Sequence, residues 1–173
     1  MYLARNRKLQ RLKNYNYSQN GFYFVTTCTQ YSVPFFGFVK NGEMVLNKWG
    51  KIVEQQILWM EKHFPYIKIN EFIVMPNHVH AIIIIEHVGT ILGLSLQPKQ
   101  YQRRHNLLSK TINAFKTTSS KKIHQNGMNI FKWQRSFHDR IIRDEIELNI
   151  IRQYIVDNPK NWKHDRNNAK IKL

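Results

Sequence analysis

The sequence predicts an α+β fold in which an antiparallel sheet carries packed helices. Short runs of β-branched and aromatic residues with a two-residue period predict the strands. Longer segments with apolar residues at helical spacing alternate with these runs, and Asn-Gly or Pro-Asn pairs separate neighbouring strands. The chain of 173 residues suits one domain with its own core, and we expect that domain to span residues 1–173.

The first strand is predicted at Gly21–Gln30, which reads "GFYFVTTCTQ". The Asn-Gly pair at 41–42 lies between two short apolar runs and predicts a hairpin. Asn47 is suited to be an N-cap, and Pro65 ends the helix that we expect to follow it. One face of this helix carries Trp49, Ile52, Val53, Gln56, Ile57, Met60 and Phe64.

Two further strands are predicted at Ile67–Met75 and His78–Glu86. Pro76-Asn77 separates them, so we expect an antiparallel pair. The second strand is apolar on both faces, which is typical of a central strand covered on both sides. Residues 87–104 have no such pattern and are expected to form a loop.

The second half of the chain predicts a helix in His105–Ile123 and a strand within Phe131–Arg143. Asp144 and Glu147 stand in a capping-box arrangement before a last helix, which Pro159 ends. The long elements then follow the order β-α-β-β-α-β-α. This order predicts a ferredoxin-like or RRM-like sheet with the helices on one face.

The charge balance indicates a polyanionic partner. The chain has 27 Lys and Arg against 11 Asp and Glu, which gives a formal charge of +16. Phosphate backbones attract such a surface, so nucleic acid is favoured over an anionic membrane. We find no apolar segment of ~20 residues, no lipidation signal and no signal peptide, and expect a cytoplasmic protein with no membrane partner. The ends of the chain, about 1–18 and 163–173, are expected to be basic arms.

The histidines His78 and His80 begin an apolar strand. Residues i and i+2 of a strand point the same way, so the two imidazoles share a face and could chelate one ion. An HxH pattern by itself is weak, because two hydrogen-bonded polar residues at a strand end would have the same spacing. The single cysteine, Cys28, excludes an internal disulfide and a multi-cysteine zinc site.

Tyr154 and Asn158 are four residues apart on the last predicted helix. This spacing places the phenol and the amide on one helical face, where a metal held by the amide oxygen would lie near the phenol oxygen. Tyr154 could instead be a core aromatic, and Asn158 a turn residue before Pro159. A residue before proline is also disfavoured in helical geometry.

Three blocks of the sequence resemble a known family. "FIVMPNHVHAIIII", "WQRSFHDRIIRDE" and "YIVDNPKNW" look like the signature blocks of the REP-associated tyrosine transposases and the related single-strand insertion-sequence transposases, members of the HUH endonuclease superfamily. The resemblance covers roughly Gly21 to Trp162 and implies the HUH endonuclease fold. It also implies that His78 and His80 bind a divalent ion, Mg²⁺ or Mn²⁺, with Asn158 as third ligand.

By the same resemblance, Tyr154 is the nucleophile, and attack on DNA would leave a 3′-hydroxyl and a 5′-phosphotyrosine. The expected partner is single-stranded or hairpin DNA, since the nucleophile must reach an exposed phosphodiester. Whether the chain acts alone or as a homodimer is left open. Besides a transposase, a DNA- or RNA-binding regulator without catalysis and a replication or relaxase-type nickase fit the same residues.

Basic and aromatic side chains around the third helix and the fourth strand are candidates for DNA contact. For each cation, a solvated surface charge is an equally good interpretation. Trp133 could stack on unpaired bases, whereas core packing is favoured for Phe137. The charged candidates are Lys110, Lys116, Lys121, Lys122, Arg135, Arg140 and Arg143.

Overall fold

A four-stranded antiparallel sheet forms the centre of the computed structural model, which describes residues 17–86 and 106–168. The strand order is β4 (Ile67–Met75), β5 (His78–Ile85), β1 (Gly21–Cys28) and β6 (His138–Ile142). The four predicted strands are confirmed. β5 lies between two neighbours and is buried along almost its whole length, as its two apolar faces predict.

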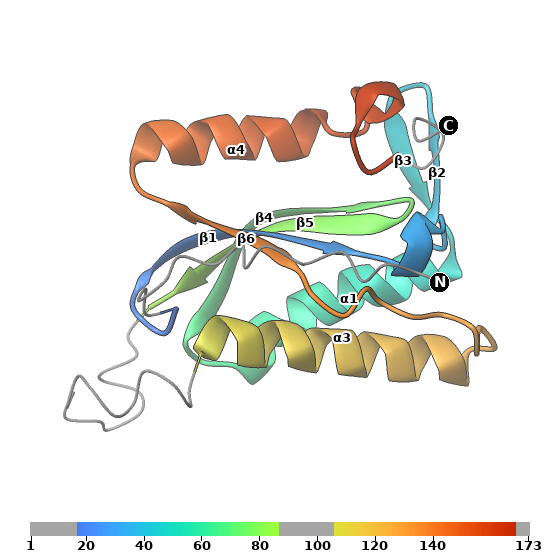
Figure 1. The fold of residues 1–173 in the computed structure, drawn as a ribbon, viewed down its shortest axis with the longest axis horizontal. Helices are drawn as coiled ribbons and strands as arrows, with labels where there is room; N and C mark the ends of the chain where they lie inside the picture. The colour runs from blue at the N-terminus through green and yellow to red at the C-terminus, as the bar shows by residue number, and fades with distance from the viewer. Residues whose placement is uncertain (1–16, 87–105, 169–173) are drawn as a thin grey trace, which may run out of the picture.

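Two long helices cover one face of this sheet, and a third covers the other (Figure 1). α1 (Lys48–His63) and α3 (Leu107–Gln125) pack on each other and on the first face, and α4 (Glu145–Asp157) lies on the opposite face. The α+β fold and the order of long elements are confirmed. Nothing in residues 17–86 or 106–168 forms a helix long and apolar enough to cross a membrane.

The prediction that all helices share one face is wrong. β5 offers apolar side chains on both sides, so each side needs a cover. The larger core lies under α1 and α3. A smaller cluster lies under α4, in which Ile82 and Ile142 of the sheet contact apolar residues of the helix, namely Leu148, Ile151 and Ile155.

A short hairpin, β2 (Gly37–Lys40) and β3 (Glu43–Leu46), stands beside the sheet, as the Asn-Gly pair predicts. Asn41 and Gly42 both have positive φ, 52° and 77°, which this pair of residues tolerates. Asn47 then caps α1, because its Oδ1 accepts hydrogen bonds from two backbone amides of the first turn. The predicted cap is confirmed.

The start of α4 is tied to the edge strand β6. Asp144 Oδ1 accepts from Glu147 N at 2.8 Å, which confirms the N-cap. Glu147 Oε2 accepts in return from Arg143 N at 2.9 Å, one residue before the position that a capping box would use. Glu147 also pairs with Arg140 of β6. The helix is thereby fixed to its neighbouring strand at the first turn.

Only residues 17–18 and 163–168 of the two predicted basic arms lie within the described chain, and they pack on the body of the protein. The described part of the first arm packs on the body, where Tyr17 is buried against Tyr23 and Ser18 Oγ accepts from Leu107 N. The second arm was expected from residue 163. Residues 163 and 164 instead belong to a 3-10 turn, Trp162–His164, and the buried Asp165 follows this turn. The expected loop at 87–104 lies outside the described residues.

Lys116 is not the exposed residue that the helical pattern predicts. It is buried on α3, and its ammonium donates to the backbone carbonyls of Gln134, Arg135 and Ser136 at 2.6, 3.4 and 3.0 Å. Burial lowers the pKa of Lys116 to about 8. The long stem of lysine lets the charge reach these carbonyls from a core-facing position. Lys116 therefore holds the segment before β6 and is not available to DNA.

We expect Lys116→Met to lower the free energy of unfolding by about 2–3 kcal/mol, because it keeps the stem but removes the charged donor of three backbone carbonyls. The matched control is Lys121→Met on the exposed side of the same helix, with an expected change within about 0.5 kcal/mol. Urea unfolding at pH 7 measures both. Equal effects of the two substitutions would contradict the structural role of Lys116.

Candidate active site

The two histidines at the start of β5 converge on one point. His78 and His80 are both fully buried, and their Nε2 atoms lie 3.0 Å apart. They share a face of the strand, as their spacing predicts. Two ring nitrogens at this separation can act together on one ion or one proton.

Asn77 fixes the orientation and the tautomer of His78. Asn77 Nδ2 donates to the carbonyl oxygens of Ser32 at 2.9 Å and Asn167 at 2.7 Å. Its Oδ1 can therefore only accept, and it lies 2.8 Å from His78 Nδ1. The proton of His78 is then on Nδ1, and the lone pair on Nε2 faces the site.

His80 is held by β1 and by an aromatic ring. Thr26 pairs with His80 across the sheet, and its Oγ1 lies 2.8 Å from His80 Nδ1. The Phe24 ring stacks on the imidazole with centroids 5.2 Å apart. Burial lowers the pKa of His78 to about 4 and that of His80 well below its usual value. Both rings are neutral at pH 7, the form in which imidazole binds metals.

Tyr154 reaches the histidines from α4. Its hydroxyl lies 3.3 Å from His80 Nε2, and its ring meets Phe24 edge-on, so it belongs to the site and not to the core. The side chain stays 40% exposed, which leaves the hydroxyl accessible. Burial and then the Asp165 carboxylate raise the pKa of Tyr154, and the Arg166 charge and the Asn158 amide oppose them. The phenol is protonated at neutral pH and needs a nearby cation to react as an anion.

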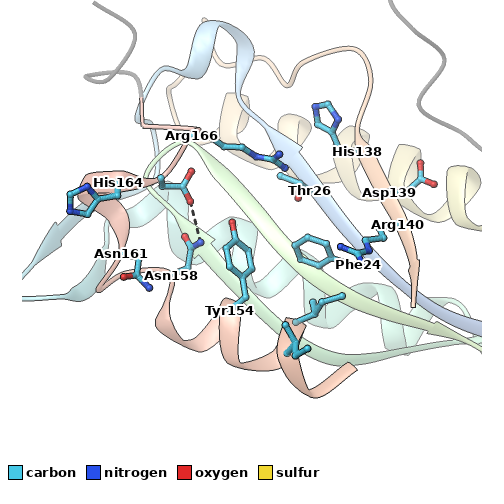
Figure 2. Close-up of a pocket in the computed structure, with 13 residues that line it drawn as sticks. Phe24, Thr26, His138, Asp139, Arg140, Tyr154, Asn158, Asn161, His164 and Arg166 are labelled. Carbon is cyan, nitrogen blue, oxygen red and sulfur yellow. Dashed lines mark hydrogen bonds between the residues drawn. The ribbon is translucent and has the colours of Figure 1, made fainter. Parts of the chain in front are cut away.

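Asn158 keeps helical geometry although it precedes Pro159, with φ −56° and ψ −41°. It lies on the same side of the helix as Tyr154, as the four-residue spacing predicts (Figure 2). Asn158 Nδ2 donates to Asp165 Oδ2 at 3.1 Å, while its Oδ1 is buried and has no hydrogen-bond partner. A buried acceptor without a donor fits a position where a cation binds.

Asp165 completes the site, and no pattern in the sequence selects it. It can offer a carboxylate oxygen within 4.8 Å of ligand nitrogens of His78 and His80. Asn167 N donates to Asp165 Oδ1 at 2.6 Å and fixes the carboxylate. The only available signal was an acidic residue inside a strongly basic end, "KHDRNNAK". Two imidazoles, an amide oxygen and a carboxylate form a donor set that fits Mn²⁺ or Mg²⁺.

Tyr154, Asn158 and Asp165 line a cavity of about 850 Å³ between β1, β6, α4 and the segment that follows α4 (Figure 2). The β6 side of the cavity carries His138 and Arg140, which pair across the sheet with Thr26 and Phe24. The opposite side carries side chains of the C-terminal segment, namely Asn161, His164, Asp165 and Arg166.

The remaining candidates for DNA contact divide into surface and core residues. The cations other than Lys116 are exposed, and Arg140 lines the cavity while paired with Glu147. Trp133 belongs to the core: its ring packs against three phenylalanines and its Nε1 donates to Ser119 Oγ at 3.0 Å. This packing accounts for Trp133 as a partly buried core residue, and the base-stacking role stays a prediction. Phe137 packs against the larger core, as favoured. The exposed candidates are Lys110, Lys121, Lys122, Arg135, Arg140 and Arg143.

We expect the protein without metal to lose stability as the pH falls from about 6.5 toward 4. Because burial lowers the pKa of both His78 and His80, the unfolded chain binds more protons than the folded chain in this window. Each extra proton costs about 1.4 kcal/mol per pH unit, and the stability is fully present above the window. Urea midpoints at pH 7 and pH 5 in a chelating buffer measure the loss.

The double variant His78→Gln, His80→Gln removes both titrating groups and should show a shallower loss. His63→Gln changes an exposed histidine on α1 and serves as the control with wild-type pH dependence. Parallel curves for the wild type and the double variant would contradict the assignment to these histidines.

Comparison with known proteins identifies one relative by sequence and solved structures of similar fold. No family model matches the chain. The chain is 38% identical over 166 residues to an uncharacterized protein of Haemophilus influenzae, a match that covers 93% of this chain and 92% of that protein. Its structure is similar to that of a REP-associated tyrosine transposase bound to a REP hairpin, with a TM-score of 0.56 and 19% identity, over 88% of this chain and 73% of that one.

A candidate transposase from Deinococcus radiodurans gives a TM-score of 0.44 at 14% identity, over 85% of this chain and 97% of that one, a score too low to support an argument. The fold that the three sequence blocks imply is confirmed by the first of these structures. The chain belongs to the same family as the Haemophilus influenzae protein, and it has the fold of the REP-associated tyrosine transposase.

Proposed function

We propose that this protein is a DNA strand-transferase of the transposase type, which cuts and rejoins single-stranded or hairpin DNA through a 5′-phosphotyrosine. The observation that carries the proposal is the position of the Tyr154 hydroxyl, 3.3 Å from His80 Nε2 and beside two converging imidazoles. Nucleophile and histidines come from one chain, and Tyr154 lines a cavity beside the buried imidazoles. A core tyrosine or a pair of structural histidines would have no reason to meet there.

A divalent ion, Mg²⁺ or Mn²⁺, fits the donor set of this site. His78, His80 and the unpartnered Oδ1 of Asn158 would hold it, and Asp165 would add a carboxylate oxygen. When bound, such an ion polarises a phosphate oxygen and favours the phenolate form of a neighbouring tyrosine. Asn77 and Thr26 support this role, because they hold the two imidazoles from behind.

The protein side chains position the reacting groups. Tyr154 presents its oxygen at the end of a side chain that Phe24 and His80 hold in place. Attack by this oxygen on a phosphodiester forms the P–O bond to tyrosine and breaks the P–O3′ bond. The phenol loses its proton, and the departing 3′-oxygen gains one. Because the phosphodiester energy is kept in the phosphotyrosine, the 3′-hydroxyl of a second strand can reverse the step without ATP.

The charge of +16 and the exposed cations on α3 and β6 favour a nucleic-acid backbone as the partner. A single strand or a hairpin suits the cavity, since one phosphodiester must reach Tyr154. The similar transposase, which was solved with a hairpin bound, supports the same class of substrate here.

Tyr154→Phe tests the nucleophile. The change keeps the ring and its contacts with Phe24 but removes the attacking oxygen, so the fold should remain and the covalent DNA adduct should vanish. Labelled single strands incubated with Mn²⁺ and separated on a denaturing gel reveal the adduct. The matched control is Tyr31→Phe, which changes an exposed tyrosine distant in sequence from Tyr154. It should leave the adduct at the wild-type level.

The same gel separates the alternatives. Binding without an adduct in the wild type would favour a regulator, and an adduct without joining of a second strand would favour a nickase. An adduct that persists in Tyr154→Phe would contradict the assignment of this nucleophile.

His80→Ala tests the ion. We expect cleavage to fall below detection, because one imidazole ligand and the contact to Tyr154 are both lost. DNA affinity should stay within about threefold of wild type, since affinity rests on the surface cations. Calorimetric titration with Mn²⁺ should show loss of the site in His80→Ala and its retention in His63→Ala, a histidine on the exposed side of α1. Undiminished Mn²⁺ binding by His80→Ala would contradict the proposed ligand set.

A further inference from the structure

Arg166 is a cation in the active-site cavity that forms no ion pair within residues 17–86 and 106–168. It directly follows Asp165 and lines the same cavity as Tyr154. Its guanidinium makes no hydrogen bond or ion pair with any residue of the described chain. Other cations near the site are paired: Arg140 with Glu147, and Lys160 with Asp157.

The guanidinium lies among the reactive groups. Figure 2 shows it on the side of the cavity to which the Tyr154 hydroxyl points, directed toward Thr26. Its positive charge adds to burial in lowering the pKa of His78, His80 and His138, and it opposes the rise in the pKa of Tyr154 that burial and Asp165 cause. One exposed cation therefore acts on four side chains from three elements of the fold.

The acidic groups nearby are committed elsewhere. The Asp165 carboxylate accepts from Asn158 Nδ2 and from Asn167 N, and it faces the histidine pair. Asp139 lines the cavity from β6 and acts on His138. An unpaired guanidinium beside a nucleophile leaves room for an anion that the protein itself does not supply.

We propose that Arg166 binds the non-bridging oxygens of the scissile phosphate and stabilises the negative charge that they gain during attack by Tyr154. A guanidinium suits this task, because it stays charged and presents a fork of donors that matches two phosphate oxygens. Charge develops on these oxygens in the transition state, so a donor fixed at this place accelerates the reaction more than it tightens binding. The inference rests on the proposed strand transfer and assigns the residue that receives its phosphate.

The first experiment separates catalysis from binding. On a single strand that the wild type cuts in Mn²⁺, Arg166→Ala should reduce the single-turnover rate at saturating DNA by about 10²–10³-fold. DNA affinity should change by less than about threefold, because one cation among many is lost. Arg166→Lys should recover only part of the rate, since an ammonium lacks the fork. Lys160→Ala removes a cation that lines another cavity, and its rate should match the wild type.

The second experiment tests the charge on the phosphate directly. A methylphosphonate at the scissile position replaces one charged oxygen by a neutral methyl group, and each of its two diastereomers is assayed separately. Each diastereomer is neutral and lacks one of the two oxygens that Arg166 would bind, so the wild type and Arg166→Ala should react with it at rates within about threefold. A rate difference that persists in full on both diastereomers would overturn the role of Arg166.

The outcomes of the two proposals are distinguishable. A wild-type protein that forms no adduct with any single strand would overturn the strand-transfer function and this inference with it. A wild type that cuts while Arg166→Ala cuts equally fast would overturn this inference only. Melting curves of Arg166→Ala within error of wild type ensure that a loss of rate is not a loss of fold.

Discussion

The side-chain amide of Asn77 is the contact on which the site depends. Its Nδ2 joins two backbone carbonyls, those of Ser32 and Asn167, which belong to opposite ends of the described chain. Its Oδ1 accepts a hydrogen bond from Nδ1–H of His78 and so fixes the Nε2 lone pair toward His80. The side chain is almost fully buried, so no water can replace these partners without cost. The same side chain therefore joins two distant segments of the chain and sets the tautomer of His78.

One face of the sheet carries the larger core, and the other carries the smaller cluster beside the site. The larger core under α1 and α3 contains most of the buried apolar side chains and holds the strands in register. The smaller cluster under α4 needs to hold only one helix, and it ends where Phe24, His80 and Tyr154 meet. The site thus lies at the border between apolar packing and an open cavity. This position explains why the imidazoles are buried while Tyr154 is partly exposed.

Most of the fold could be predicted from the sequence, because it depends on local patterns. The strand periods, the Asn-Gly hairpin and the caps at Asn47 and Asp144 are signals within a few residues. The position of α4 could not be predicted in the same way. A strand that is apolar on both faces indicates that other elements pack on both sides of the sheet. It does not indicate which helix packs on which side.

The candidate site was predictable where residues share one element. His78 with His80, and Tyr154 with Asn158, follow from the periods of a strand and a helix. Asp165 and Arg166 come from an irregular segment whose path no period describes, and Thr26 shows only the β-branched character of any strand residue. The helical spacing does not predict the burial of Lys116, because it gives the direction of a side chain and not the position of the charge at the end of a long flexible stem.

The residues of the site are synthesised at different times. Thr26 and the histidine pair are synthesised early, whereas α4 and the segment with Asp165 follow every strand of the sheet. Domains form as their residues emerge from the ribosome, with N-terminal parts first. A nascent chain that already has its histidines on β5 still lacks the tyrosine, the amide that supports it and the neighbouring carboxylate. An unfinished copy therefore lacks residues that the proposed strand transfer requires until the end of the chain has left the ribosome.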